Sequence, residues 1–531
     1  MNKVEFQGNS FPDIFSMLDK YRKFMYVKNY IIIYRKGTLI MLFNSYEFMF
    51  FLPIIAIVYY SLPQKARNLW LLAANLYFYM CWNAYYVALL TVTIVTSYLA
   101  GYLFDRFPQK VVTRQIVLWV TIVVNLGLLF FYKYLDFALV NMSAISSRLG
   151  MSFHATKLNL ALPVGISFYT FKALSYVLDV YRRKYACTHN FIHYANYISF
   201  FPAILSGPID RANHFIPQLE KKHKFDYRRV RQGMLLMLWG YFLKLVISDR
   251  AAQFANVVYT TPTDYSGAFS LIATLLYAVQ IYCDFWGYSS TARGVAQVLG
   301  FSIAENFRQP YFATSIGEFW RRWHISLSSW LKEYVYIGLG GNRCSRARKY
   351  FNLMVTFLVS GLWHGSSWNY VIWGFLHGTY QIIGDFTKPF RQKSLQLMHV
   401  DINSIVHRNF CRIITSTLVT FSWIFFFANG TKSALRIIHH MFTNFEPWTM
   451  FDGTLFDVAL SRPEFGVLIL GIIIVLFVDI LKYNHVNIQG WIERQHVLFR
   501  WTLYYLVLFT IIVFGVYGSE YSASAFVYFQ F

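Results

Sequence analysis

Residues 466–478 read GVLILGIIIVLFV, an unbroken apolar run. Two further runs, Leu118–Leu129 and Leu503–Val513, contain almost nothing polar. With their flanks, all three reach the roughly 20 residues that a helix needs to cross the hydrocarbon of a bilayer. The runs do not alternate between apolar and polar residues, which favours helices over the strands of a membrane barrel. The sequence therefore predicts an all-α integral membrane protein.

The composition of the whole chain agrees with several membrane crossings. Of its 531 residues, 56% are hydrophobic, 20% are aromatic and only 14% are charged, and the mean hydropathy is +0.38. Soluble domains carry about 25% charged residues. Candidate spans lie at about 47–62, 69–100, 115–142, 160–180, 233–248, 267–283, 350–384 (a pair), 411–428, 464–482 and 498–517. Some of the longer runs could be one tilted helix or two.

The strong positive charge does not indicate nucleic-acid binding. The 48 Lys and Arg exceed the 25 Asp and Glu, so the net charge is +23, which in a soluble protein would suggest a nucleic-acid partner. Here the basic residues lie in short loops between apolar runs, the arrangement that keeps such loops in the cytoplasm. We expect membrane lipids around the chain and no nucleic acid.

Residues 1–40 differ from the rest of the chain. They are polar as far as Lys20, and then basic residues alternate with aromatic residues and Ile. This pattern is typical of an interfacial stretch, but it also fits an extension that is not part of the working protein, with Met41 as the functional start. We expect residues 41–531 to form a single membrane domain.

Basic flanks identify one apolar run that should not cross the membrane. Arg and Lys residues at 182–184 and 221–231 flank the run 191–206, so both ends should face the cytoplasm. The run is short, contains Pro202 and is followed by Gly207-Pro208. It is therefore predicted to be a re-entrant or broken helix.

The same reasoning places a histidine deep in the membrane. Residues 323–342 lie between basic groups, so they should stay near the cytoplasmic face, and the chain enters the membrane from Tyr350. A helix rises 1.5 Å per residue, so Trp363 is about 21 Å further on, within the roughly 30 Å of hydrocarbon. His364 should then lie far from either surface, where an ionisable residue is a candidate for function.

The surroundings of His364 allow two interpretations. The sequence around it, GLWHGSSW at 361–368, combines small residues with indoles, so backbone or substrate can approach closely. An imidazole can accept a proton near neutral pH and act as a general base. A histidine that only packs between helices is an equally good interpretation of the spacing alone.

A second histidine lies in the helix-like segment FWRRWHISLSSW at 319–330. Trp320, Trp323 and His324 recur at helical spacing, so one face could be aromatic and carry the histidine, although such aromatics more often anchor a helix at the interface. Arg321 and Arg322 could bind phosphate or could only fix the topology.

A carboxylate and the cysteines complete the candidate groups. Asp284 lies among aromatic residues, where it could orient a histidine or pair with an arginine. No nucleophile elbow, phosphate-binding loop or metal triad is recognisable. The sequence predicts no zinc site and no disulfide framework, because its cysteines are scattered without close pairs: Cys81, Cys187, Cys283, Cys344 and Cys411.

Two of these motifs together resemble the membrane-bound O-acyltransferase family, most closely its alginate O-acetylase branch. The motifs are EFWRRWHISL at 318–327 and, 40 residues after its histidine, GLWHG at 361–365. The resemblance covers about Met41 to Phe531. Supporting stretches are LPVGISFYTF at 162–171, DVYR at 179–182, Phe201-Pro202, GPI at 207–209 and FVYFQF at 526–531.

The resemblance implies a fold, a reaction and a site. The fold is a ring of about 11 transmembrane helices with re-entrant segments and a central tunnel. His364 matches the catalytic histidine and His324 a second position that supports catalysis. Further candidates for substrate or donor binding are Trp320, Arg321, Arg322, Trp323, Asp284, Trp363 and Asn369, and no metal is implied.

The implied function is O-acetylation of an exported or cell-wall polysaccharide from the bacterial cytoplasmic membrane. The acetyl group would come from a cytoplasmic donor, acetyl-CoA, with no bound cofactor. A separate periplasmic or extracytoplasmic acetyltransferase would often complete the transfer. Two alternatives remain at this point: transfer of D-alanine to teichoic acid by a related branch, and a non-enzymatic polysaccharide transporter subunit, which the composition also permits.

Overall fold

The computed structural model describes residues 41–151, 153 and 155–517. Over these residues every regular element is a helix, and they contain no strand. The prediction of an all-helical chain is confirmed. The predictions for residues 1–40 and for the motif at 526–531 concern residues outside the described range.

Several helices have the length and composition of membrane spans. The described part of the chain contains seven: Tyr86–Arg106, Val111–Arg148, Tyr227–Thr260, Gly267–Val298, Ile405–Phe427, Arg462–Tyr483 and Val497–Phe514. The other predicted spans form helices that are shorter or less apolar. The protein therefore crosses the membrane several times, while the number of about 11 spans, the ring and the tunnel stay predictions.

The helices of the first half pack into one apolar core. The predicted run 69–100 forms two helices, because the Asn83 side chain accepts a hydrogen bond from the Tyr85 N–H (3.0 Å) and closes a turn between them. The elements are α2 (Tyr46–Ser61), α3 (Gln64–Met80), α4 (Tyr86–Arg106), α5 (Val111–Leu129), the π-helix η1 (Phe130–Tyr134), α6 (Leu135–Arg148), α7 (Ile166–Tyr181), α8 (Phe191–Ser199), α9 (Phe201–Ile204) and α10 (Ala212–Glu220).

The run 191–206 forms a broken helix, as predicted. α8 ends at Ser199 and the four-residue α9 follows, and neither is long enough to cross the hydrocarbon. At the break, the Phe201 N–H donates to Asn75 Oδ1 of α3 (2.8 Å), and Asn75 Nδ2 donates to Asn196 Oδ1 of α8 (2.9 Å). Buried amides therefore satisfy the backbone where the helix is interrupted.

The middle of the chain forms the long buried helix α13 (Gly267–Val298), whose residues belong to both apolar cores. The helix α11 (Tyr227–Tyr241) continues through the π-helix η2 (Phe242–Ser248) into α12 (Asp249–Thr260) and packs along α13. A methyl group on Gly240 would clash with the Gly287 carbonyl oxygen, and one on Gly294 with the Gly233 carbonyl oxygen. Small residues thus let the two backbones approach closely.

The second half carries both predicted histidine motifs. The predicted pair 350–384 is confirmed as α16 and α17, which pack along each other. The elements are α14 (Ile316–Arg322), α15 (Ile325–Trp330), the π-helix η5 (Leu331–Tyr336), α16 (Arg346–His364), α17 (Trp368–Phe386), α18 (Lys388–Leu397), α19 (Ile405–Phe427), α20 (Thr431–Thr443), α21 (Arg462–Tyr483), α22 (Ile488–Glu493), α23 (Val497–Phe514) and the short 3-10 turns η3 (Pro262–Asp264), η4 (Pro310–Phe312), η6 (Pro447–Met450) and η7 (Thr454–Asp457).

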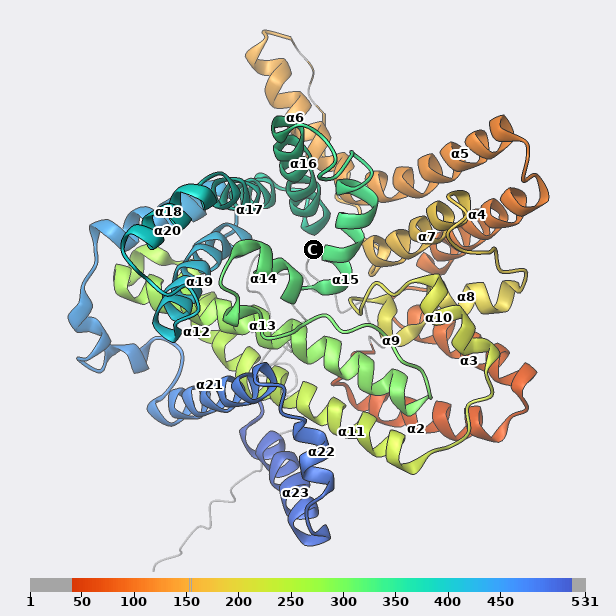
Figure 1. Cartoon of the computed structure of the whole chain (residues 1–531). Coiled ribbons are helices and arrows are strands. Elements are labelled where there is room, and N and C mark those ends of the chain that lie inside the picture. The colour runs from red at the N-terminus through yellow and green to blue at the C-terminus, as the bar shows by residue number, and fades with distance from the viewer. Residues whose placement is uncertain (1–40, 152, 154, 518–531) are drawn as a thin grey trace, which may run out of the picture. The chain divides into compact units, whose positions relative to one another are not determined.

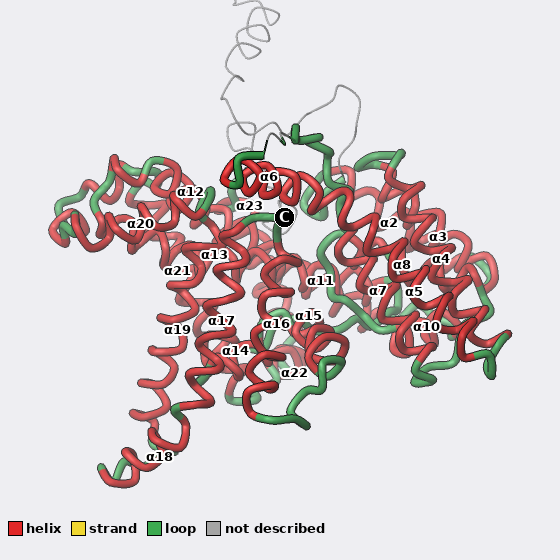
Figure 2. Tube along the Cα trace, turned by 90° about the horizontal axis from the view of Figure 1, so that it is seen from above, coloured by secondary structure: helices red, strands yellow, loops and turns green. Residues whose placement is uncertain are grey.

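Two views show how these elements are arranged. Figures 1 and 2 place α2–α5, α7, α8 and α10 on one side, and α12 and α19–α21 on the other. In both views α14, α15 and α16 lie between the two groups. The segments that carry the two histidine motifs are therefore surrounded by helices from both halves of the chain.

Candidate functional site

His324 lies at a sharp turn between two short helices. α14 ends at Arg322 and α15 begins at Ile325, while His324 has the left-handed φ of 42°. The helix-like interpretation of 319–330 is therefore wrong at this point. The Ile325 N–H donates to the Asn306 carbonyl (3.0 Å) and the Ser326 N–H to Asn306 Oδ1 (3.2 Å). These bonds hold a backbone conformation that costs a non-glycine residue about 1–2 kcal/mol.

The two histidines, 40 residues apart, meet around one indole. The Trp363 ring centroid lies 5.8 Å from the His324 ring and 4.9 Å from the His364 ring. On its other sides His364 contacts the rings of Trp373 and Phe426, each at 5.1 Å. Both imidazoles are almost fully buried. The structure thus brings together three of the predicted site residues, His324, Trp363 and His364.

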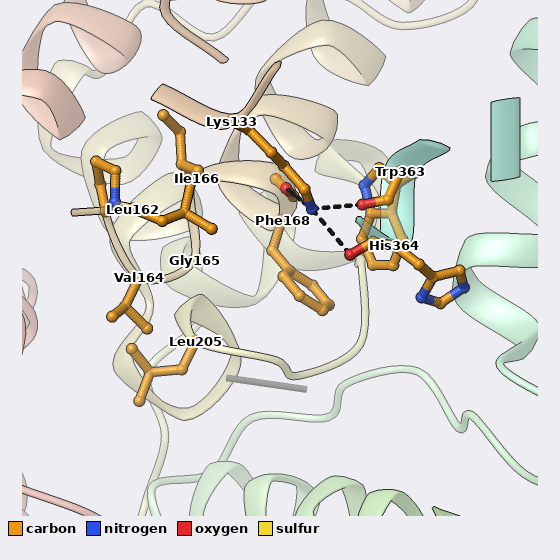
Figure 3. A pocket seen from close by; sticks show the side chains of 11 residues that line it. Lys133, Leu162, Val164, Gly165, Ile166, Phe168, Leu205, Trp363 and His364 are labelled. Atoms are coloured by element: carbon orange, nitrogen blue, oxygen red, sulfur yellow. Dashed lines mark hydrogen bonds between the residues drawn. The ribbon is translucent and has the colours of Figure 1, made fainter. Parts of the chain in front are cut away.

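The C-terminal end of α16, where His364 is the last residue, is held by two side chains of η1. Lys133 Nζ donates to the carbonyl oxygens of Trp363 (2.6 Å) and His364 (3.2 Å), as Figure 3 shows, and the Tyr134 hydroxyl donates to the carbonyl of Leu362 (2.8 Å). The last carbonyls of a helix have no partner within it and carry partial negative charge. The buried ammonium and the phenol therefore fix the backbone that carries His364. We call Lys133 and Tyr134 the helix clamp.

The helix clamp was not predicted from the sequence. Lys133 is only 8% exposed and lies in a run that reads as a membrane span. The available signal was an ionisable residue within an apolar run. A π-helix places adjacent side chains differently from an α-helix and often occurs at functional sites. Here η1 lets both Lys133 and Tyr134 reach the same helix end.

A small cavity lies beside the helix clamp. Its volume is about 40 Å³, and residues 162–168 and Leu205 line it opposite Lys133, Trp363 and His364. Figure 3 shows the His364 carbonyl directed toward Lys133 and its imidazole directed away. Gly165 has φ 77°, and a side chain there would clash with the Ile204 carbonyl. The cavity has room for a few water-sized groups and is too small for a sugar.

The α16–α17 crossing positions His364 from the other direction. A methyl group on Gly361 would clash with the Tyr370 carbonyl, and one on Gly365 with the Tyr370 ring. Asn369, a predicted binding residue, donates through Nδ2 to the Ala428 carbonyl (2.7 Å). Asn369 therefore ties the start of α17 to the end of α19.

A third buried histidine, His377, was missed by the sequence analysis. Trp320 Nε1 donates to His377 Nδ1 (3.2 Å), and Ser422 Oγ, which donates to the Val419 carbonyl (2.7 Å), lies 2.8 Å from His377 Nε2. This pattern assigns the proton to Nε2, so the imidazole donates to Ser422. Trp320 thus holds His377 in place, and the network links α14, α17 and α19.

The other aromatic and basic residues of the first motif have separate surroundings. Trp323 is buried and its ring lies 5.4 Å from Phe319 and 5.2 Å from Trp423. Arg322 forms an ion pair with Glu318 (2.8 Å), while Arg321 is exposed. Arg322 is thus held by a carboxylate of its own helix, while Arg321 is directed to the surface.

Asp284 pairs with a lysine. Lys244 Nζ of η2 lies 2.6 Å from Asp284 Oδ1 and 2.9 Å from Asp249 Oδ1, and all three side chains are nearly buried. The basic partner is thus a lysine, where the sequence suggested an arginine, and the role of orienting a histidine stays a prediction. The neighbouring Phe285 contacts the His324 ring (4.6 Å). Asp284 of α13 is therefore linked through Lys244 of η2 to Asp249 of α12.

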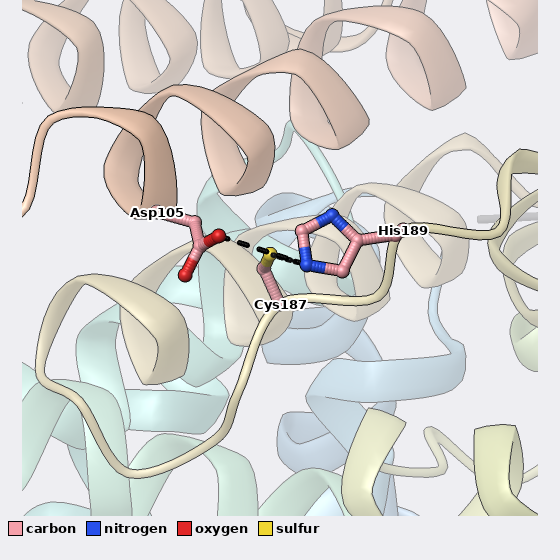
Figure 4. Close-up of side chains that lie close together, drawn as sticks. All are labelled: Asp105, Cys187 and His189. Atoms are coloured by element: carbon pink, nitrogen blue, oxygen red, sulfur yellow. Dashed lines mark hydrogen bonds and ion pairs between the residues drawn. The ribbon is translucent and has the colours of Figure 1, made fainter.

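One group of potential metal ligands lies outside this site. The ligand atoms of Asp105, Cys187 and His189 lie within 4.8 Å of one another, and His189 Nε2 is 3.6 Å from both partners (Figure 4). Burial and the Asp105 carboxylate raise the pKa of Cys187 to about 11. The thiol therefore keeps its proton at neutral pH. The contact ties the end of α4 to the loop before α8.

Comparison with known proteins places these motifs in a family. Residues 182–422 match the family model described as MBOAT, membrane-bound O-acyltransferase family. The "Probable alginate O-acetylase AlgI" of Azotobacter vinelandii is 34% identical over 453 residues, which cover 85% of this chain and 87% of that protein. The "Peptidoglycan O-acetyltransferase" of Helicobacter pylori is 33% identical over 439 residues, 76% of this chain and 80% of that protein.

A shorter similarity extends to a third kind of protein. The "Teichoic acid D-alanyltransferase" of Bacillus subtilis is 28% identical over 249 residues, 44% of this chain and 62% of that protein. The resemblance seen in the sequence motifs is therefore confirmed over most of the chain, and the transporter interpretation is set aside. This multi-pass protein belongs to the membrane-bound O-acyltransferase family.

Proposed function

We propose that this protein transfers acetyl groups from cytoplasmic acetyl-CoA toward hydroxyl groups of an exported or cell-wall polysaccharide. It acts from the bacterial cytoplasmic membrane and hands acetyl to, or works beside, a separate periplasmic or extracytoplasmic acetyltransferase. The acceptor class follows from the two acetyltransferase relatives, which align with at least three quarters of the chain. Because the chain is embedded in the membrane, donor and acceptor need not share a compartment.

The observation that carries the reaction is the placement of His364. Its imidazole is buried among aromatic rings, and its backbone is fixed by the helix clamp on one side and the α16–α17 crossing on the other. Such positioning favours reaction because the catalytic group needs no reorganisation at the moment of transfer.

His364 acts as a general base in this scheme. Its imidazole removes the proton of an acceptor hydroxyl while the hydroxyl oxygen bonds to the thioester carbonyl carbon. The carbon–sulfur bond then breaks, and the coenzyme A thiolate leaves and takes up the proton. His324, which contacts the same indole as His364, supports the geometry around Trp363.

Ester analysis distinguishes acetyl transfer from the alternative that the Bacillus relative suggests. We expect mild base to release acetate from the envelope or secreted polysaccharide of cells that carry the protein, and less acetate from cells that lack it. Release of D-alanine in place of acetate would indicate transfer of D-alanine to teichoic acid instead. No difference in either ester between the two kinds of cells would contradict the proposal.

The helix clamp yields a testable prediction. Replacing Lys133 by Met keeps most of the side-chain volume but removes the donors to Trp363 and His364. We expect acetyl transfer to fall about a hundredfold, because a misplacement of about 1 Å can cost that much. Transfer is measured in membranes with matched protein levels. Lys133→Arg keeps a cationic donor and should recover most activity, whereas full activity of Lys133→Met would show that only packing matters.

A further inference from the structure

A second cleft lies on the side of the molecule formed by η4, α19 and α21. Its volume is about 550 Å³, within the 300–1,000 Å³ typical of small-molecule sites. The first turns of α19 contribute Arg408 and Arg412, and none of the lining residues is a carboxylate. The preceding helix α18 carries Lys388, Arg391 and Lys393, so this end of α19 is predicted to face the cytoplasm.

Hydrogen bonds hold both arginines at the wall of this cleft. Arg412 donates through Nε to the Phe312 carbonyl (3.3 Å) and through Nη1 to Asn409 Oδ1 (2.8 Å). Arg408 donates to the Tyr483 hydroxyl (2.5 Å). A guanidinium has five N–H donors in a planar fork, so each arginine keeps further donors for an anionic ligand. Such a fork binds a phosphate group through two parallel hydrogen bonds.

Aromatic faces accompany the arginines. The rings of Phe312 and Tyr483 stack with centroids 5.2 Å apart at 28°. The Arg412 guanidinium lies 5.3 Å from the Phe312 ring and 5.0 Å from the Tyr483 ring, and Arg322 of the first motif lies 5.3 Å from Tyr483. Purine bases stack on aromatic and guanidinium planes. The cleft therefore offers guanidinium groups that can bind phosphate and aromatic faces that can bind a purine.

The wall of this cleft continues toward the catalytic histidine. Tyr311 lines the cleft, and its ring lies 6.4 Å from Trp323. Trp323 in turn contacts Trp423 (5.2 Å), which stacks on Trp373 (5.8 Å). Trp373 contacts the His364 ring (5.1 Å). The His364 imidazole thus faces the layer of rings that leads to the cleft, on the side away from Lys133.

We propose that the cleft between η4, α19 and α21 binds the phosphorylated adenosine end of the acyl-coenzyme A donor. Arg408 and Arg412 bind the phosphates, and the purine packs against the Phe312 and Tyr483 faces. In coenzyme A the thioester stands at the far end of a flexible arm from the nucleotide, and that arm follows the aromatic layer toward His364. This assignment rests on the proposed function and adds to it the site that selects a nucleotide-bearing donor.

Binding to purified protein tests the assignment without an acceptor. We measure Kd for coenzyme A in detergent without phospholipid, for wild type, Arg408→Gln, Arg412→Gln and the control Lys393→Gln. Lys393 is exposed and lies outside the cleft. We expect each arginine variant to weaken binding by about tenfold to a hundredfold, since hydrogen bonds to charged groups are lost, and the control to stay within twofold. Adenosine 3′,5′-bisphosphate should displace coenzyme A, and phosphatidylglycerol should not.

A truncated donor separates this inference from misfolding and from the proposed function. S-acetyl-N-acetylcysteamine carries the acetyl thioester without a nucleotide. In isolated envelopes, Arg412→Gln should transfer acetyl from it as wild type does, while losing transfer from low concentrations of acetyl-CoA. Equal coenzyme A binding by wild type and the arginine variants would contradict only the assignment of the cleft as the nucleotide site. Displacement of coenzyme A by phosphatidylglycerol would contradict it as well. A wild type that binds no coenzyme A and uses neither donor would overturn the proposed donor as well.

Discussion

Purified His364→Ala protein is expected to transfer acetyl about 10² to 10⁴ times more slowly than wild type, the range that general-base catalysis contributes. The substitution removes the imidazole but leaves the carbonyl that Lys133 binds. It also leaves the glycine contacts of the α16–α17 crossing. Folding should therefore be retained, and the loss should appear in the rate of transfer. This rate is measured as the amount of acetyl transferred from acetyl-CoA to an extracted polysaccharide acceptor per unit time.

The matched control for this variant is His439→Ala. His439 is an exposed histidine of α20 and makes no contact with the site residues described above. It should transfer acetyl at the wild-type rate. A His364→Ala protein that elutes as a single species and keeps wild-type transfer would show that His364 only packs between helices, the alternative that the spacing left open.

The second large effect is expected on stability, at the buried cluster of Lys244, Asp249 and Asp284. Lys244 Nζ lies within 3 Å of both carboxylates, and the lysine and Asp284 side chains are at most 2% exposed. Lys244→Met removes the cation that both carboxylates share. Removing one partner of a buried ion pair costs about 3–5 kcal/mol. We expect a marked drop in the midpoint of thermal unfolding of the detergent-extracted protein.

The neutralised cluster provides the control. A triple variant, Lys244→Met with Asp249→Asn and Asp284→Asn, removes the charges together, and such replacements are far less costly than breaking a pair. It should recover much of the stability that the single variant loses. If the triple variant is as unstable as Lys244→Met, the lysine contributes through packing and the electrostatic explanation is wrong.

Residues that act through local pattern could be predicted from the sequence. The apolar runs identified the long helices, and the basic flanks identified the broken segment at 191–206. The GLWHG motif identified the buried His364 at the end of a helix, next to the glycines of a close helix crossing. Each of these features depends on residues close together in the chain, so composition and spacing were sufficient.

Features that depend on distant partners could not be predicted in this way. Lys133 is 230 residues from Trp363, and the π-helix that directs it has no composition signal. Asp284 meets a lysine because η2 packs on α13. The turn at His324 depends on Asn306, which satisfies the backbone there. In each case the three-dimensional contact overrides what the local sequence favours.

The central claim is that this chain acetylates a polysaccharide through His364, and one measurement in cells tests it most directly. Base-releasable acetate is measured on the envelope and secreted polysaccharide of cells with wild-type protein, with His364→Ala, or with no protein, at membrane levels matched by blotting. We expect acetate to fall equally in the variant and in the deletion, and the polymer fraction that loses it identifies the acceptor. Wild-type acetate in cells with the His364→Ala protein would contradict the claim.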